Sequence, residues 1–334
     1  MKIVIFDVEP WECETFEPLQ EKHELVFEQD ALDAEAAEKH VDADIVSAFI
    51  YSDFSREVLD RFGNLQFIAT RSTGVDHIDM DWCRENGVAV SNVPTYGANT
   101  VAEHVFALLL AISHNVVDAA ERTRRGDFMQ GGLQGFDLMG RTMGVIGTGD
   151  IGVHTARIAR GFGMEVLAFD VKPREDVARE TGFDYVEMDE LLRRSDVISL
   201  HVPGNEKTRN LIDADVFDRM KDGAVLINTA RGTVVETEAL LQALSSGKLR
   251  AAGLDVLPEE PVVREEAELL RSYFDRAHHL DTLLADHILL RMRNVLITPH
   301  TGFNTREAVQ RILDTTRENI EGFMAGRAPN LVTP

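Results

Sequence analysis

The 334-residue sequence has few cysteines and a deficit of positive charge. Its two cysteines, Cys13 and Cys83, form no CxxC pair, so we expect no disulfide framework and a reduced, cytoplasmic setting. Lysine and arginine number 34 against 57 aspartates and glutamates, which gives a formal net charge of −23. Because a chain this acidic repels phosphate groups, we expect neither a nucleic-acid partner nor an affinity for anionic membranes.

Long apolar runs are also absent. The longest extends over eight residues, Val105 to Ile112, whereas a membrane-spanning helix needs about 20. A run near the start, Ile3 to Phe6, is closed by Asp7 and is too short for the core of a signal peptide. We therefore expect a buried strand there, no export signal and no membrane partner.

The sequence does contain the alternating pattern of an α/β protein. Hydrophobic residues make up 44% of the chain, and its length suggests about two domains of roughly 150 residues each. Short apolar runs alternate with helical patterns, which is typical of parallel sheets covered by helices. We expect strands at 4–6, 44–46 and 67–69 and a helix at 55–62. Apolar residues at spacings of three and four then predict one long helix over 99–125.

A second series of strands and helices follows a Gly-rich loop at 131–135. Its strands are expected at 142–146, 165–169, 197–200, 224–228 and 253–256, with a last strand at 295–297 and a final helix at 305–325. A further helical pattern covers about 264–290. The two series predict two α/β lobes, the second inserted into the first.

A glycine-rich motif of the form GxGxxG opens the second series. It consists of Gly147, Thr148, Gly149, Asp150, Ile151 and Gly152. An apolar strand precedes it, a helical pattern follows it, and the next strand ends at Asp170, 21 positions after Gly149. This context is the fingerprint of a dinucleotide-binding loop. Gly147 would permit the tight turn, Gly149 would let a pyrophosphate approach the backbone, and Gly152 would allow close packing of helix on strand.

The expected cofactor is NAD. The carboxylate of Asp170 would accept hydrogen bonds from the adenosine ribose and would repel the 2′-phosphate of NADP. Lys172 and Arg174 follow closely, so positive side chains that could bind the 2′-phosphate are also present. The alternative is a glycine turn that binds no cofactor, which the placement of strand, helix and acid disfavours.

Three later segments each place one reactive side chain after a strand. These side chains are Arg231, Glu260 and His300. Because the carboxyl ends of parallel strands meet at one edge of a sheet, the three could form a site for hydride transfer. Arg231 would hold a carboxylate, His300 would exchange a proton with the substrate oxygen, and Glu260 would keep His300 protonated. Taken singly, each could equally be a surface charge or a loop residue.

These motifs resemble the D-isomer-specific 2-hydroxyacid dehydrogenase family across nearly the whole chain. The matching segments are 72–79 (STGVDHID), 101–104 (VAEH), 147–152 (GTGDIG), 200–203 (LHVP), 228–232 (NTARG) and 298–300 (TPH). The resemblance implies two lobes, each a doubly wound parallel sheet, with a Rossmann-type NAD domain at 100–299 inserted into a flavodoxin-like substrate domain at 1–99 and 300–334. It also implies Arg231, Glu260 and His300 as the catalytic set and a homodimer formed through the NAD domain.

Within the family, the segments 92–96 (NVPTY) and 196–203 (DVISLHVP) resemble the D-lactate dehydrogenase branch, which reduces pyruvate with NADH. The resemblance implies a substrate site formed by backbone N–H groups and aromatic side chains, at Ser72, Thr73, Gly74, Val75, Tyr96, Phe49 and Phe303. Further cofactor contacts are expected at His201, Val202, Pro203, Thr229, Ala230, Arg231, Asp255 and His300. Asp255 would also shape the charge around His300 and Glu260.

Two other functions stay open. Ser72 and Thr73 stand where lactate enzymes often have Asn-Val, and the stretch from Glu260 to His300 is longer than expected for that branch. The substrate could therefore be glyoxylate, hydroxypyruvate or a bulkier 2-oxo acid. Some relatives instead use this fold as an NAD-responsive module that binds other proteins. No metal is expected, because convincing third and fourth ligands are missing around the remaining histidine cluster, His278, His279 and His287.

Overall fold

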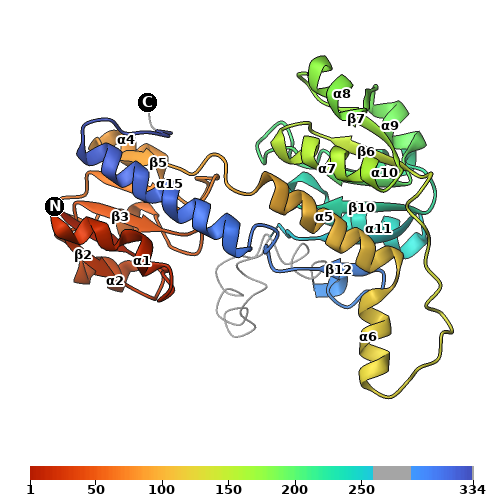
Figure 1. The fold of residues 1–334 in the computed structure, drawn as a ribbon, viewed down its shortest axis with the longest axis horizontal. Coiled ribbons are helices and arrows are strands. Elements are labelled where there is room, and N and C mark those ends of the chain that lie inside the picture. The colour runs from red at the N-terminus through yellow and green to blue at the C-terminus, as the bar shows by residue number, and fades with distance from the viewer. Residues whose placement is uncertain (259–286, 333–334) are drawn as a thin grey trace. The chain divides into compact units, whose positions relative to one another are not determined.

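The structure is a computed structural model that describes residues 1–258 and 287–332 of the chain (Figure 1). The chain divides into two compact units. The first unit consists of Met1–Tyr96 and Asn304–Pro334, and the second consists of Gly97–Phe303. The first unit is thus built from both ends of the chain, with the second inserted between them. Each unit is an α/β structure around a parallel sheet.

The first unit contains a five-stranded sheet in the order β2-β1-β3-β4-β5. All of its neighbouring strands pair in parallel, which is the order of flavodoxin-like folds. The strands are β1 (Lys2–Ile5), β2 (Glu24–Phe27), β3 (Ile45–Ala48), β4 (Phe67–Thr70) and β5 (Ala89–Ser91). Every residue of the central strands β3 and β4 is buried, which explains why apolar residues predominate in both.

Helices cover both faces of this sheet. They are α1 (Cys13–Phe16), α2 (Ala34–Lys39), α3 (Arg56–Leu59), α4 (Met80–Asn86), α15 (Arg306–Met324) and the 3₁₀ helix η1 (Glu17–Glu21). The long C-terminal helix α15 packs on one face, where Phe323 stacks on Phe67 with ring centroids 4.3 Å apart. A second apolar cluster, which includes Phe54 and Trp82, covers the other face. The carboxylate of Asp79 caps α4 by accepting the N–H of Trp82.

The second unit contains a seven-stranded parallel sheet in the order β12-β11-β10-β9-β6-β7-β8. Its strands are β6 (Thr142–Ile146), β7 (Glu165–Phe169), β8 (Asp184–Tyr185), β9 (Val197–Leu200), β10 (Ala224–Asn228), β11 (Leu249–Leu254) and β12 (Val295–Ile297). The strand order reverses between β6 and β9, as it does in the Rossmann fold. Open α/β sheets bind their ligands at such a switch point, outside the carboxyl ends of the strands.

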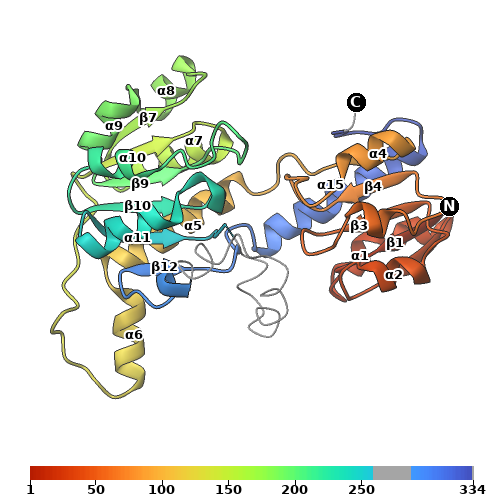
Figure 2. The ribbon, with the colours of Figure 1, turned by 180° about the vertical axis from the view of Figure 1, so that it is seen from behind.

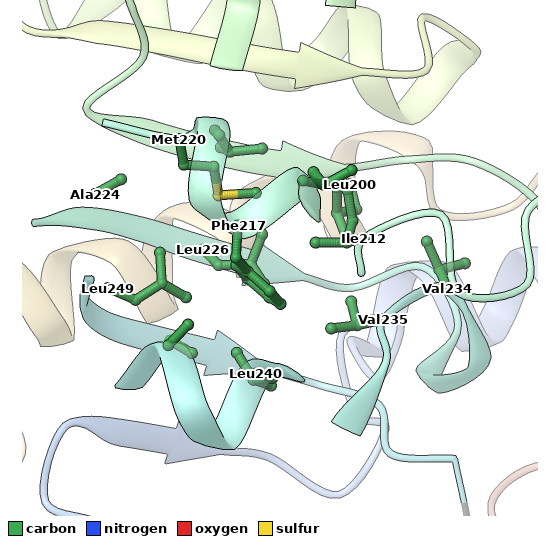
Figure 3. Packing of buried hydrophobic residues seen from close by; sticks show 14 of the residues in the cluster. Leu200, Ile212, Phe217, Met220, Ala224, Leu226, Val234, Val235, Leu240 and Leu249 are labelled. Carbon is green, nitrogen blue, oxygen red and sulfur yellow. The ribbon is translucent and has the colours of Figure 1, made fainter. Parts of the chain in front are cut away.

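Two helical layers cover this sheet (Figures 1 and 2). One layer contains α5 (Ala98–Ser113) and α7 (Asp150–Gly161), and the other contains α9 (Met188–Arg194), α10 (Ala214–Arg219) and α11 (Thr237–Ser246). The remaining helices are α6 (Val116–Arg124), α8 (Glu175–Thr181) and the 3₁₀ helix η2 (Gly232–Val234). Figure 3 shows part of the second layer's core, where Phe217 of α10 lies beside Leu226 of β10.

The single helix predicted over 99–125 is wrong, because the structure breaks it into α5 and α6 with a bend of 62°. Asn115 adopts a left-handed conformation with φ of +50° and donates from its side chain to the carbonyl of Leu133. The carbonyl of Ser113 accepts the N–H of Phe136 at 2.9 Å. Phe136, directly after the Gly-rich loop, therefore occupies a carbonyl that would accept the next N–H of a continuous helix. No residue of α6 is buried, so no packing opposes the bend.

Among the residues that the structure describes, no single helix is long and apolar enough to cross a membrane. The bent pair α5 and α6 meets that test only by length and composition. The strand predicted at 253–256 begins earlier in the structure, as β11, and ends at Leu254. The helical pattern at 264–290 lies mostly outside the described residues.

Candidate active site

The sequence-predicted residues of the second unit lie along one edge of its sheet, where the strands end. Because all seven strands run parallel, the loops that follow them meet at this carboxyl edge. The predicted residues follow β6 (147–152), β7 (Asp170), β9 (201–203), β10 (229–231), β11 (Asp255) and β12 (His300). Glu260 lies outside the described residues, so its pairing with His300 remains a prediction.

The three glycines of the loop after β6 differ in what surrounds them. Gly147 has φ of +94°, and a Cβ there would lie 2.6 Å from the carbonyl oxygen of His201. A Cβ on Gly152 would lie 2.0 Å from the carbonyl oxygen of Gly147. At Gly149, in contrast, no described atom comes within 4 Å of an added Cβ. The first and third glycines are therefore required for packing, while the second leaves the backbone open.

This open space lies at the start of α7. Gly149 is the N-cap of that helix, and no side chain caps its first N–H groups. Unsatisfied N–H groups and the positive end of the helix dipole make such a terminus a binding site for phosphate. The residues present therefore fit the pyrophosphate of a dinucleotide.

The carboxylate of Asp170 is held by the glycine loop. Its Oδ2 accepts the backbone N–H of Thr148 at 2.6 Å and the Thr148 hydroxyl at 3.0 Å, while Oδ1 accepts the N–H of Lys172 at 2.8 Å. Burial would raise the pKa of Asp170, but these hydrogen bonds outweigh it, and the pKa lies below its usual range. The group therefore stays ionised, as an acceptor for ribose hydroxyls requires.

Two side chains hold Thr148 beside this carboxylate, and the sequence had indicated neither contact. The hydroxyl of Tyr185, from β8, lies 2.6 Å from Thr148 Oγ1, and the side chain of Arg174 donates to the carbonyl of Thr148. Both hold Thr148 in place, and the positive charge of Arg174 acts on Asp170. Tyr185 comes from a two-residue strand, which leaves no periodic signal in the sequence.

Replacing Asp170 with Ala is expected to weaken NADH binding by about tenfold to a hundredfold, since two charge-assisted hydrogen bonds to the ribose are lost. NADPH binding should weaken less or improve, because the repulsion of its 2′-phosphate disappears while Arg174 remains. Fluorescence titration with both nucleotides measures the two dissociation constants. Asp176→Ala, an exposed carboxylate in the first turn of α8, is the control. An unchanged ratio of the two constants would contradict the role of Asp170.

His201 follows β9 at the switch point. Its Nε2 lies 2.9 Å from the hydroxyl of Ser199, and burial lowers its pKa to about 3. The imidazole is therefore neutral at physiological pH. The loop continues through Val202 to Pro203, whose carbonyl accepts the hydroxyl of Thr208 at 2.6 Å.

The low pKa of His201 predicts a loss of stability in acid. The unfolded chain takes up this proton near pH 6.5, whereas the folded unit takes it up only near pH 3. The contribution of His201 to the free energy of unfolding is therefore constant above pH 6.5. Below pH 6.5 it decreases by up to about 1.4 kcal/mol per pH unit. Urea unfolding at pH 7 and pH 5 should show a smaller pH dependence for His201→Gln than for the wild type. Equal pH dependence in the two proteins would contradict this role of His201. The control is His114→Gln, at an exposed histidine.

A buried asparagine shapes the turn after β10. Asn228 accepts the N–H of Ala230 at 3.0 Å through Oδ1 and donates through Nδ2 to the carbonyl of Arg231 at 3.0 Å. Within the described residues, the buried hydroxyl of Thr229 has no hydrogen-bond partner. An orphaned buried hydroxyl at this edge fits a contact to a bound cofactor. The side chain of Arg231 packs against Gly204, because a Cβ added to Gly204 would lie 2.9 Å from the Cγ of Arg231.

The turn after β12 wraps around Asp255. The carboxylate of Asp255 accepts the hydroxyl of Thr298 at 2.6 Å and the backbone N–H groups of Thr301 and Gly302 at 2.9 and 2.8 Å. Burial would raise the pKa of Asp255, but hydrogen bonds from His104, Thr298 and Gly302 hold it below its usual range. The ionised carboxylate of Asp255 therefore places a negative charge next to the turn that contains His300.

His300 itself has an unusual backbone. Its φ is +52°, in the left-handed region, and its N–H donates to the carbonyls of Asp255 and Thr298, both at 2.9 Å. Strained backbone of this kind persists only where the surroundings determine it. The turn after β12 therefore fixes where His300 emerges from the sheet.

The predicted substrate loop, Ser72 to Val75, follows β4 in the first unit. Ser72 is buried, and its hydroxyl bonds Thr70 Oγ1 and the carbonyl of Gly74, both at 2.7 Å. Thr73 Oγ1 donates to the carbonyl of Val93 at 2.8 Å. No residue in the described part of the chain accepts a hydrogen bond from the backbone N–H groups of Thr73, Gly74 or Val75. These three groups therefore remain available to a carboxylate.

Two further residues that support this loop were not found from the sequence. The guanidinium of Arg71 is 3% exposed and donates to the carbonyls of Phe6 and Asp7, which ties the ends of β1 and β4 together. His77 packs edge-on against Phe54, and burial lowers its pKa to about 4. Both lie within or beside the motif at 72–79, which is the signal that could have identified them.

The aromatic residues expected in the substrate site divide between the units. Phe49 follows β3 in the first unit and contacts Tyr51 edge-to-face, with ring centroids 5.4 Å apart. Its backbone N–H donates to Asp7 at 3.3 Å. Tyr96 is the last residue of the first segment of that unit, and its carbonyl accepts the side chain of Arg311. Phe303 is the last residue of the second unit.

The fold and the glycine loop of the second unit are those of a dinucleotide-binding domain, and comparison with known proteins agrees. A family model described as "D-isomer specific 2-hydroxyacid dehydrogenase, NAD binding domain" matches residues 106–302. The chain belongs to the D-isomer-specific 2-hydroxyacid dehydrogenase family, and it resembles the D-lactate dehydrogenase branch. The family, the fold class, NAD and the oxidoreductase activity expected from the sequence are thereby confirmed.

Three relatives illustrate the similarity. D-lactate dehydrogenase of Escherichia coli is 34% identical over 99% of both chains. Glyoxylate reductase of Korarchaeum cryptofilum is 35% identical over 88% of this chain and 84% of its own. Among solved structures, D-lactate dehydrogenase from Aquifex aeolicus complexed with NAD and lactic acid has a TM-score of 0.85 at 34% identity, and the match covers 100% of this chain and 99% of that chain.

Proposed function

We propose that this protein is a D-lactate dehydrogenase that reduces pyruvate with NADH. The observation that carries the proposal is the carboxyl edge of the second unit, where the glycine loop, the Arg231 turn and the Asp255-bound His300 turn follow strands of one parallel sheet. The full-length similarity to lactate enzymes supports pyruvate as the substrate. We assign NAD binding to the second unit and most substrate contacts to the first.

The residues divide the work by their chemistry. When bound, the nicotinamide supplies the hydride that reduces the keto carbon. Arg231 would hold the substrate carboxylate with two parallel N–H groups, helped by the backbone N–H groups of the 72–75 loop. His300 would donate a proton to the keto oxygen, and remove it in the reverse direction. Glu260 would accept a hydrogen bond from His300 and favour its protonated form.

The cofactor residues follow the same edge. The N–H groups at the start of α7 would bind the pyrophosphate, and Asp170 would bind the adenosine ribose. Further contacts to NAD are proposed at the turns after β9, β10, β11 and β12, at His201, Val202, Pro203, Thr229, Ala230, Arg231, Asp255 and His300. The aromatic side chains of Phe49, Tyr96 and Phe303 would surround the substrate.

Substrate preference is tested by initial rates of NADH oxidation with pyruvate, glyoxylate, hydroxypyruvate and phenylpyruvate. We expect the highest kcat/KM with pyruvate. A higher value with another acid would keep the mechanism and change the substrate. Glyoxylate is the specific alternative, because the chain is similar to a glyoxylate reductase. Binding of NADH without turnover of any acid would instead favour an NAD-responsive module that binds other proteins.

We further propose a cytoplasmic homodimer joined through the NAD-binding unit. Three large apolar side chains of the segment that follows α6 are exposed to solvent, namely Phe128 at 78%, Met129 at 74% and Met139 at 78%. Contact with a second copy would remove this apolar surface from water. Light scattering after size exclusion should therefore give twice the chain mass of 37.3 kDa. A monomer would contradict the dimer. Cell fractionation tests the cytoplasmic location, which the free thiols of Cys13 and Cys83 support.

A further inference from the structure

A histidine of helix α5 contacts the residues that follow β11 and β12. The Nε2 atom of His104 lies 2.9 Å from Thr298 Oγ1 and 3.3 Å from Asp255 Oδ1. All three residues belong to the second unit, so these contacts lie within one compact body. The roles proposed above for catalysis and binding do not use His104 or Thr298.

The direction of each hydrogen bond follows from the number of protons. The hydroxyl of Thr298 has one proton, which it donates to the carboxylate of Asp255 at 2.6 Å. The Nε2–H of His104 therefore donates mainly to this same oxygen, at 2.9 Å, and its longer contact of 3.3 Å with Asp255 Oδ1 is the weaker branch. The three side chains form a relay in which His104 donates to Thr298 and Thr298 donates to Asp255.

The relay connects the His300 turn to the core of the unit. On α5, the neighbours of His104 include Val105 and Leu108, which are buried against the sheet. At the other end, Asp255 accepts N–H groups from Thr301 and Gly302, on the far side of His300. The turn is therefore fastened to a rigid helix through side chains rather than through the backbone alone.

The residues around the relay are closely packed. A Cβ on Gly302 would lie 2.8 Å from Asp255 Oδ2 and 3.3 Å from His104 Cδ2. Between these contacts, His300 holds a left-handed backbone conformation, which a residue with a side chain adopts at an energetic cost. The relay contributes hydrogen bonds that can offset this cost.

We propose that His104 is a positioning residue that sets the orientation of His300 through Thr298 and Asp255. The inference rests on the proposed function of His300 as the group that exchanges a proton with the substrate. His104 itself touches neither substrate nor cofactor in this scheme. Its removal should therefore affect the proton-transfer step more than the binding of either ligand.

Replacing His104 with Phe keeps a ring of similar size and removes the donor. We expect kcat to fall by about tenfold, the value of one lost hydrogen bond, while KM and the dissociation constant of NADH change by less than about twofold. His104→Gln should restore most of the rate, because its amide can donate to Thr298. The matched control is His114→Phe, an exposed position directly after the same helix.

A double-mutant cycle tests the relay directly. Thr298→Val removes the hydroxyl and should lower kcat by a similar factor, and the double variant with His104→Phe should be no slower than either single variant. Losses that multiply in the double variant, or a His104→Phe enzyme with the wild-type kcat, would overturn the relay. A tenfold loss that His104→Gln fails to recover would also overturn it.

A second readout requires no turnover. In a crystal structure of His104→Phe, we expect the Thr298 hydroxyl to leave Asp255 or His300 to leave the left-handed region. If that variant does not fold, His104→Ala provides the same comparison. An unchanged turn would overturn the inference. A wild-type protein that reduces no 2-oxo acid would overturn the proposed function instead, and the crystal structure would still decide the inference.

Discussion

His300→Ala is expected to lower kcat for the reduction of pyruvate by about a hundredfold or more, because the reaction loses its general acid. Transfer of a hydride to the keto carbon leaves negative charge on the oxygen, and without His300 water must supply the proton. The dissociation constant of NADH should change much less than kcat, since His300 is one of several proposed contacts to NAD and the glycine loop and Asp170 lie at other strand ends. Stopped-flow absorbance and fluorescence titration measure the two quantities separately.

The backbone of His300 complicates this substitution. Alanine is disfavoured at a φ of +52°, so His300→Ala could disturb the turn as well as remove the acid. Asn tolerates the left-handed region, so His300→Asn removes the imidazole and leaves the turn intact. Equal losses in both variants would locate the effect in proton transfer. Near-normal kcat in His300→Asn would show that His300 is not the general acid. The control is His114→Ala, at an exposed histidine.

Strands buried on both faces could be predicted closely from the sequence. The central strands β6, β9 and β10 begin and end where the sequence indicated, because strands covered by helices on both sides consist mainly of apolar residues. Three strands at or near sheet edges gave no comparable signal. In β2 no residue is fully buried, β5 has three residues, and β8 has two.

The break between α5 and α6 could not be predicted, because it depends on a loop that returns from further along the chain. Apolar spacing continues through His114 and Asn115, but the loop at 133–136 binds the carbonyl of Ser113 and the side chain of Asn115. Neither residue carries a local sign of this contact. A periodic pattern reports which side of a helix is apolar, and it does not report where tertiary contacts end the helix.

The candidate site shows the same division between local and distant signals. The glycine loop, Asp170, Arg231 and His300 each stand directly after a strand, so their position along the chain already placed them at the carboxyl edge. His104, in contrast, lies 194 positions before Thr298. Only the packing of α5 against the sheet brings the two together, and only the VAEH motif marked the segment.

Arg231→Gln is expected to lower kcat/KM for pyruvate by about a hundredfold to a thousandfold, mostly through a higher KM. A guanidinium can hold both oxygens of a carboxylate, and the glutamine that replaces it has no charge. Arg231→Lys keeps the charge but loses the paired N–H geometry, so we expect an intermediate value. Steady-state kinetics over a range of pyruvate concentrations separates the change in KM from the change in kcat.

The structure makes Arg231 a favourable place for this test. Asn228 holds the backbone carbonyl of Arg231, and this contact does not depend on the Arg231 side chain. The turn should therefore survive the substitution, and NADH binding, which has many other proposed contacts, should weaken much less than the binding of pyruvate. Arg250→Gln is the matched control, because Arg250 is exposed near the start of β11, away from the carboxyl edge. If KM for pyruvate stayed unchanged in Arg231→Gln, the backbone N–H groups of the 72–75 loop would have to bind the carboxylate without it.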